Sequence, residues 1–126
     1  MSVEFCYQLP WPPSVNRLYK RITGKRGKSG RRSNVALSDE AAAYYQEIQW
    51  TIGKGQPALN GRLKVRIDVY PPDKTRRDLD NLAKVTLDSL THAGIWKDDE
   101  QIDHLTIVRK SVEKNGRVLV TVSPII

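Results

Sequence analysis

The spacing of apolar residues changes along this chain between a period of two and a period of three to four. Apolar and polar side chains alternate over residues 3–9 and again over 63–69, the pattern of half-buried strands. Apolar residues recur at helical spacing over 39–52 and 79–93. Strand patterns return on both sides of Asn115-Gly116, a dipeptide typical of hairpin turns. The order predicts an α+β fold: a small mixed sheet in β-α-β-α-β-β order, with helices packed on it and a C-terminal β-hairpin.

The positive charge of the chain is concentrated in one segment. The 126 residues carry a formal net charge of +7, and no acid occurs between Phe5 and Ser38. Eight bases occur there: Arg17, Lys20, Arg21, Lys25, Arg26, Lys28, Arg31 and Arg32. Removing these eight would leave a net charge of −1. We therefore expect a basic flexible loop at about 14–37 that binds a polyanion such as DNA.

Several classes of protein are excluded by what the sequence lacks. The single cysteine, Cys6, allows neither an internal disulfide nor a Cys-based zinc cluster. The start has no secretory pattern, and no apolar run approaches the roughly 20 residues that cross a bilayer, so we expect a cytoplasmic protein with no membrane role. Gly27-Lys28-Ser29 resembles the end of a nucleotide-binding loop, but Ile22 replaces its first glycine, so we expect no nucleotide cofactor. The length predicts one domain, residues 1–126.

Two aspartates, Asp78 and Asp80, lie where a strand pattern ends and a helix pattern begins. Residues two apart in extended backbone point to the same side. Two converging carboxylates repel each other unless a divalent cation or a proton relieves the repulsion. Acids at a helix start are also common as caps that complement the helix dipole. The D-x-D pattern alone therefore leaves a metal site and a helix cap as alternatives.

A second acidic group, Asp98 and Asp99, precedes the next strand pattern and could lie beside the first pair. Because side chains alternate, only one of these two should point inward. Carboxylates without His or Cys suit Mg²⁺ or Mn²⁺ rather than zinc, and such ions act on phosphates. Lys84 lies on the same helical face as Asp80. Asp88 lies about 12 Å from Asp80 along the helix axis, too far to share one metal ion with it. We expect Asp88 to be a solvated residue that pairs with Lys84. Unrelated surface acids are the alternative.

Two segments, LPWPPSVNRLY and RRDLDNLAKVTLDSLTHAGIWKDDEQI, resemble the RusA family of Holliday junction resolvases, endodeoxyribonucleases common in phages and prophages. The likeness covers nearly the whole chain, and D-L-D-N-L-x-K followed by G-x-W-x-D-D is far more specific than D-x-D. It implies a homodimer that uses Mg²⁺, with Mn²⁺ as a substitute, to cut four-way DNA junctions by paired symmetric incisions in recombination and repair. It places the catalytic, metal-binding acids on Asp78, Asp80 and Asp99, and the functional lysine on Lys84.

A short cationic turn precedes the first acids. Three of its residues are expected to bind the DNA backbone: Lys74, Arg76 and Arg77. The alternative is a basic turn that is simply solvated.

Two other functions compete with junction cleavage. A non-catalytic junction-binding protein would use the basic loop and be indifferent to the acids. A magnesium-dependent hydrolase of a small phosphate would use the acids and leave the eight loop bases unexplained.

Overall fold

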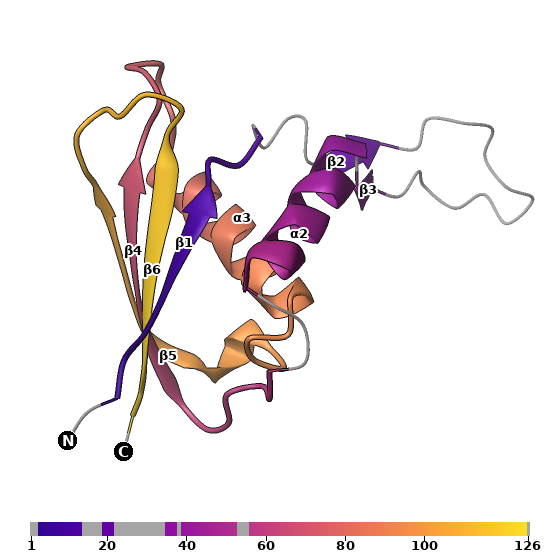
Figure 1. Cartoon of the computed structure of the whole chain (residues 1–126), viewed down its shortest axis with the longest axis vertical. Helices are drawn as coiled ribbons and strands as arrows, with labels where there is room; N and C mark the ends of the chain where they lie inside the picture. Colours follow the sequence, from indigo (N-terminus) through magenta and orange to yellow (C-terminus); the bar gives the residue numbers. More distant parts are fainter. Residues whose placement is uncertain (1–2, 14–18, 22–34, 38, 53–55, 126) are drawn as a thin grey trace, which may run out of the picture.

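The computed structural model describes residues 3–13, 19–21, 35–37, 39–52 and 56–125. Its elements confirm the α+β class: a four-stranded mixed sheet has two helices on one side (Figure 1). The sheet contains β1 (Phe5–Pro10), β4 (Leu63–Tyr70), β5 (Ile102–Arg109) and β6 (Arg117–Pro124). The helices are α2 (Asp39–Ile52) and α3 (Leu79–His92), and a 3₁₀ turn, η1 (Asp99–Gln101), precedes β5.

The strands lie in the order β1-β6-β4-β5. β6 pairs antiparallel with both β1 and β4, while β4 pairs parallel with β5. A parallel pair needs a long crossover connection, and α3 supplies it between β4 and β5. This crossover places α3 and η1 beside β5, and these three elements form the site described below.

The predicted C-terminal hairpin needs a correction. β5 and β6 run in opposite directions, as expected, but β4 lies between them and they do not pair with each other. Asn115 and Gly116 do adopt left-handed backbone, with φ of 69° and 66°. However, β5 ends at Arg109, so the connection spans residues 110–116 rather than a two-residue turn. In this connection, Lys110 N donates a hydrogen bond to Val69 O at the end of β4, at 2.8 Å. The connection crosses β4, because β4 lies between β5 and β6.

The predicted loop at 14–37 also needs a correction. It contains two short strands, β2 (Tyr19–Arg21) and β3 (Val35–Leu37), which pair antiparallel as a separate sheet. Residues 14–18 and 22–34 lie outside the described residues. The prediction that this segment is flexible therefore stays a prediction.

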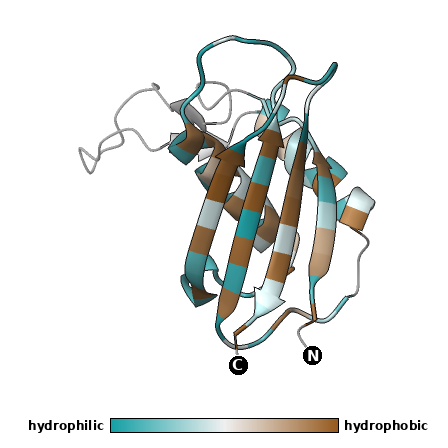
Figure 2. Ribbon diagram, turned by 90° about the vertical axis from the view of Figure 1, so that its left-hand side faces the viewer, coloured by the Kyte–Doolittle hydropathy of each residue, from teal (hydrophilic) through white to brown (hydrophobic). Residues whose placement is uncertain are grey.

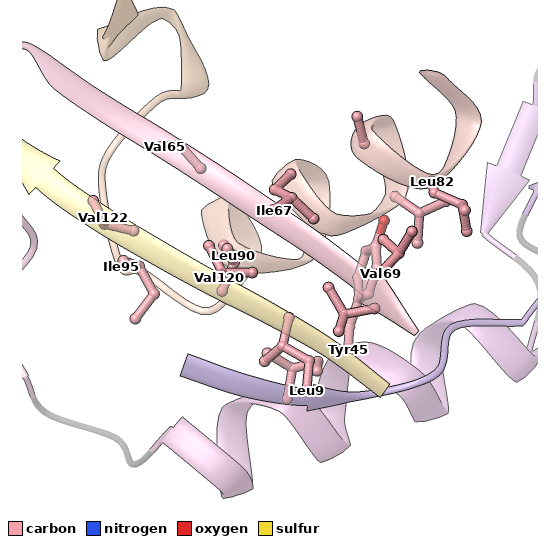
Figure 3. Packing of buried hydrophobic residues seen from close by; sticks show 14 of the residues in the cluster. Leu9, Tyr45, Val65, Ile67, Val69, Leu82, Leu90, Ile95, Val120 and Val122 are labelled. Atoms are coloured by element: carbon pink, nitrogen blue, oxygen red, sulfur yellow. The ribbon is translucent and has the colours of Figure 1, made fainter. Parts of the chain in front are cut away.

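The core lies between the sheet and the two helices (Figure 3). Alternate residues of β4, such as Val65 and Ile67, point toward the helices and have no exposed surface. Leu82 and Leu90 of α3 and Tyr45 of α2 pack against this face, as the helical spacing predicted. Burial of these side chains removes apolar surface from water, the main favourable term in folding. No helix among the described residues is long and apolar enough to cross a membrane.

Candidate active site between α3, η1 and β5

The first two acids lie where the chain enters α3. Asp78 occupies the N-cap position in extended backbone, with φ −86° and ψ 134°, but its side chain makes no capping hydrogen bond. Oδ1 of Asp80 accepts a hydrogen bond from Asn81 N at 2.9 Å. Both residues are exposed. Asp78 therefore occupies the cap position with its backbone, but its carboxylate does not cap the helix.

An open groove of about 600 Å³ runs between α3 and β5. Its apolar walls are Leu79, Ala83 and Leu87 of α3 and Leu105 and Ile107 of β5. Its charged residues are Asp80, Lys84, Asp88 and Asp99. The fold thus brings Asp80 and Asp99 to one groove although nineteen positions separate them in the sequence. Asp78 is not among the residues that line the groove.

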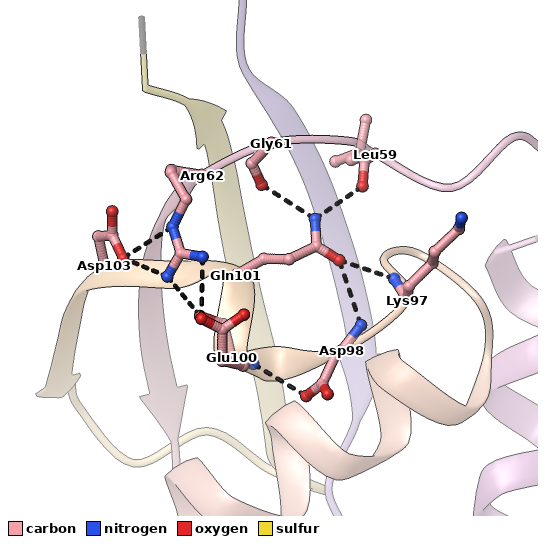
Figure 4. A network of polar contacts seen from close by, with 8 residues as sticks. All are labelled: Leu59, Gly61, Arg62, Lys97, Asp98, Glu100, Gln101 and Asp103. Atoms are coloured by element: carbon pink, nitrogen blue, oxygen red, sulfur yellow. Dashed lines mark hydrogen bonds and ion pairs between the residues drawn. The ribbon is translucent and has the colours of Figure 1, made fainter.

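The two neighbouring acids before β5 have different surroundings. Oδ1 of Asp98 accepts a hydrogen bond from Glu100 N at 3.0 Å and caps η1, as Figure 4 shows. Gln101 completes a capping box by accepting from the backbone N–H of Asp98 at 3.2 Å. Asp98 is therefore committed to local structure, and Asp99 lines the groove. Only one of the pair faces the groove, in agreement with the alternation of side chains.

Gln101 fixes this turn to the rest of the molecule (Figure 4). Its Oε1 also accepts from Lys97 N at 3.0 Å. Its Nε2 donates to the carbonyl oxygens of Leu59 and Gly61, each at 3.0 Å. Because Gln101 lies two residues after Asp99, these bonds hold the backbone that carries the Asp99 carboxylate.

The charges in the groove influence one another. Partial burial raises the pKa of the Asp99 carboxyl, and the Asp98 and Asp88 carboxylates raise this pKa further, while Lys84 acts in the opposite direction. Lys84 Nζ lies 3.3 Å from Asp88 Oδ2, so the predicted ion pair is confirmed. Asp88 was expected to be solvated; its side chain is only partly so, because it is 28% exposed and lines the groove.

The chemistry of the groove residues suits a hard divalent cation, because Asp80, Asp88 and Asp99 offer carboxylate oxygens without imidazole or thiolate. Burial raises the pKa of Asp99 most, and the neighbouring carboxylates raise this pKa further through a repulsion that a cation would relieve. In the part of the chain that the structure describes, no group of three or more acids, histidines or cysteines is close enough to hold an ion. Of the three acids expected from the sequence, Asp80 and Asp99 line one groove and Asp78 does not, so they do not form a closed ligand set.

The cationic turn divides into two kinds of residue. Lys74 and Arg76 are exposed, as a DNA-contacting role requires. Arg77 is held by the fold: its Nη1 lies 2.9 Å from Asp73 Oδ1, and its guanidinium lies 5.3 Å from the centre of the Trp11 ring. Its side chain is 23% exposed, and the expectation that Arg77 contacts DNA stays a prediction.

Two of the eight loop bases lie among the described residues. Lys20 and Arg21 belong to β2. The remaining six predicted DNA-binding residues lie outside the described residues: Arg17, Lys25, Arg26, Lys28, Arg31 and Arg32.

Two features of the site escaped the reading of the sequence. Gln101 was not singled out, although Asp98-x-x-Gln101 is a capping-box spacing that could have been found. The groove itself has no local signal, because its apolar walls come from a helix and a strand that the sequence marks only as core elements.

Sequence comparisons define the class of this protein. The family described as "Endodeoxyribonuclease RusA" matches residues 10–123. The chain belongs to the RusA family of endodeoxyribonucleases, so the resemblance noted from the motifs is confirmed. The protein named Crossover junction endodeoxyribonuclease RusA of Escherichia coli strain K12 is 39% identical over 115 residues, which cover 91% of this chain and 90% of that protein. Like-named proteins of Enterobacteria phage 82 and Shigella sonnei strain Ss046 have 39% and 38% identity over the same shares.

Proposed function

We propose that this single-domain chain is a Mg²⁺-dependent endodeoxyribonuclease that acts as a homodimer. It resolves four-way (Holliday) DNA junctions by paired symmetric cleavage in recombination and repair. The observation that carries the proposal is the groove in which Asp80, Asp99 and Lys84 meet, in a chain whose relatives are named crossover junction endodeoxyribonucleases. An acidic groove with a lysine on its wall suits hydrolysis of a phosphodiester.

Asp80 and Asp99, which both line the groove, would hold the metal together with Asp78 at the start of α3. When bound, Mg²⁺, or Mn²⁺ in its place, would neutralise the charge of the scissile phosphate and lower the pKa of a water nucleophile. The acids are suited to this role because Asp78 makes no capping bond and Asp99 is left out of the capping box that occupies Asp98.

The other groove residues support cleavage in different ways. Lys84 carries a compact cation on the groove wall, and it pairs with a phosphate oxygen whose negative charge increases in the transition state. Asp88, 3.3 Å from Lys84 Nζ, orients that cation. The apolar walls reduce the number of water molecules beside these charges and so strengthen their interactions. Outside the groove, Lys74, Arg76 and the loop bases bind the backbone without reading its sequence.

The test is incubation of the chain with a synthetic mobile four-way junction, with and without Mg²⁺, with products resolved on a denaturing gel. Paired nicks at symmetric positions that require the metal are expected. A junction that is bound but never cut would favour a non-catalytic binding protein instead.

Asp99→Asn and Asp98→Asn form a matched pair for the same assay. Asp99→Asn is expected to abolish cleavage. Asp98→Asn retains an oxygen that can cap η1 and is expected to cost much less. Equal and complete inactivation by both substitutions would contradict the assignment of Asp99.

A further inference from the structure

β5 forms one edge of the four-stranded sheet (Figure 2). Among the described strands it pairs with β4 alone. Edge strands of monomeric proteins are commonly protected by lysine, proline, a bulge or a covering element. Residues 104–108, HLTIV, contain neither lysine nor proline, and their register with β4 is regular. The middle of β5 can therefore pair with a further strand.

The helix-facing side of β5 is only partly covered. Leu105 and Ile107 lie opposite Val65 and Ile67 of β4 and therefore point to the same side of the sheet. Val65 and Ile67 have no exposed surface, whereas Leu105 is 43% exposed. The helical layer thus ends before it covers β5, and apolar surface remains open next to the candidate active site.

We propose that a second copy of this chain pairs antiparallel with β5 about a two-fold axis at Thr106. The inference deepens the proposed homodimeric function and rests on it. With the axis at Thr106, Leu105 lies opposite the partner's Ile107, and Asp103 lies opposite the partner's Arg109. The strand is therefore complementary to itself in both apolar character and charge, as an isologous interface requires.

Neighbouring registers lack this complementarity. In an antiparallel pair, the side chains of two directly opposite residues point to the same side of the sheet. The helix-facing residues of the two copies therefore lie opposite each other only when the two-fold axis passes through a residue. The neighbouring choices are thus an axis at Leu105 and an axis at Ile107. An axis at Leu105 would place Asp103 opposite an isoleucine, and an axis at Ile107 would place Leu105 opposite an arginine. With the axis at Thr106, Asp103 would pair through Oδ2, because both hydrogen bonds from Arg62 to Asp103 use Oδ1. Arg109 would pair through its remaining N–H groups, because its Nη2 donates to the carbonyl oxygen of Arg77.

This arrangement has a consequence for the active sites. A two-fold axis that continues a sheet is perpendicular to it, so both helical layers lie on the same side of the assembly. The two grooves then open on that side, where one four-way junction can contact both. Because β5 follows η1 directly, the partner's Arg109 would lie near the turn that carries Asp99, and the partner's Ile107 would cover Leu105.

Cross-linking of a residue on the axis tests the register. Thr106→Cys in a Cys6→Ser background places two thiols opposite each other, at a Cα separation of about 4.5 to 5.5 Å, which a disulfide can span. Thr121→Cys in the same background is the control, because Thr121 is also half-buried but lies on the central strand β6. Mild oxidation is expected to give a covalent dimer of the Thr106→Cys protein and none of the Thr121→Cys protein.

Sedimentation equilibrium with a matched pair of charge substitutions tests the interface. Leu105→Glu places a carboxylate in the proposed interface and is expected to raise the dimer dissociation constant at least tenfold. Val112→Glu is the control, since Val112 is 45% exposed and lies outside β5, and it should leave that constant unchanged. Both residues are exposed in the monomer, so both variants are expected to fold.

The outcomes separate the interface from the proposed function. A dimeric wild type that Thr106→Cys does not trap, or that Leu105→Glu does not weaken, would overturn the β5 interface and leave paired cleavage intact. A wild type that stays monomeric even on a four-way junction would overturn both.

Discussion

Replacing Gln101 with alanine should damage the candidate active site although Gln101 is not among the residues that line the groove. The side chain makes four hydrogen bonds, two accepted by Oε1 and two donated by Nε2. A typical protein hydrogen bond contributes a net of about 0.5 to 1.5 kcal/mol. Gln101 is only half-buried, so water will replace roughly half of the lost bonds. The expected loss in the free energy of unfolding is therefore about 1 to 3 kcal/mol.

The loss of catalysis should be larger than this loss of stability suggests. The bonds of Gln101 fix η1 against Leu59 and Gly61, and η1 begins at Asp99. A displacement of about 1 Å at a catalytic group can reduce the rate by about 100-fold. We therefore expect cleavage by the Gln101→Ala protein to fall by about that factor while the protein remains folded.

The measurements are urea unfolding, followed by circular dichroism, and single-turnover cleavage of a junction at saturating Mg²⁺. Glu100→Ala is the control in the same turn, because its ion pair with Arg62 at 3.0 Å joins side chains that are 43% and 73% exposed. Such surface pairs contribute about 0 to 1 kcal/mol, so Glu100→Ala should retain nearly full activity. A destabilised Gln101→Ala protein that cleaves at the wild-type rate would refute the link between this turn and the placement of Asp99.

Four further outcomes are expected. Asp99→Asn should lose cleavage while junction binding, measured by gel shift, stays equal or tightens; parallel loss of binding would contradict a catalytic role. Lys84→Ala should cleave slowly with an unchanged Mg²⁺ midpoint, and recovery at high Mg²⁺ would instead make Lys84 an organiser of the metal site. Alanine at four loop bases should flatten the slope of log affinity against log salt by up to about 3 to 4 units. Those bases are Lys25, Arg26, Arg31 and Arg32. Hydrogen bonds from Arg77 and then Thr75 lower the pKa of Asp73 to about 2, so its contribution to stability is present above the unfolded pKa and lost as the pH falls through about 2. Wild type should therefore have a higher thermal midpoint than Asp73→Asn at pH 7, and this difference should shrink toward zero as the pH is lowered to about 2.

The sequence predicted those parts of the fold that depend on local patterns. The apolar spacing of α2 and α3 located both helices, because each buries one face against a single sheet. The alternation in β4 identified its buried face in the same way. The pairing of β5 and β6 was not predicted correctly. Asn115-Gly116 specifies a local change of direction, whereas the position of β4 between the two strands depends on the crossover through α3.

The candidate site shows the same division. Alternation along the chain predicted that only one of Asp98 and Asp99 would face the other acids, but the hydrogen bonds of the capping box decide which one. The pairing of Lys84 with Asp88 follows from their helical spacing. The burial of Asp88 does not follow from spacing, because it depends on a groove wall supplied by β5.

The acids expected to act in cleavage and the bases expected to bind DNA lie in different parts of this molecule. Inside the groove, three carboxylates and one ammonium group give a net charge of −2 when all are ionised, so the groove alone repels DNA. The bases that we expect to attract DNA lie elsewhere, on the cationic turn and in the segment between Phe5 and Ser38. Removing a groove carboxylate and removing a loop base should therefore change junction affinity in opposite directions. If Asp99→Asn and the loop substitutions both weakened binding in the absence of metal, the groove would not be a separate acidic site, and the assignment of cleavage to it would fail.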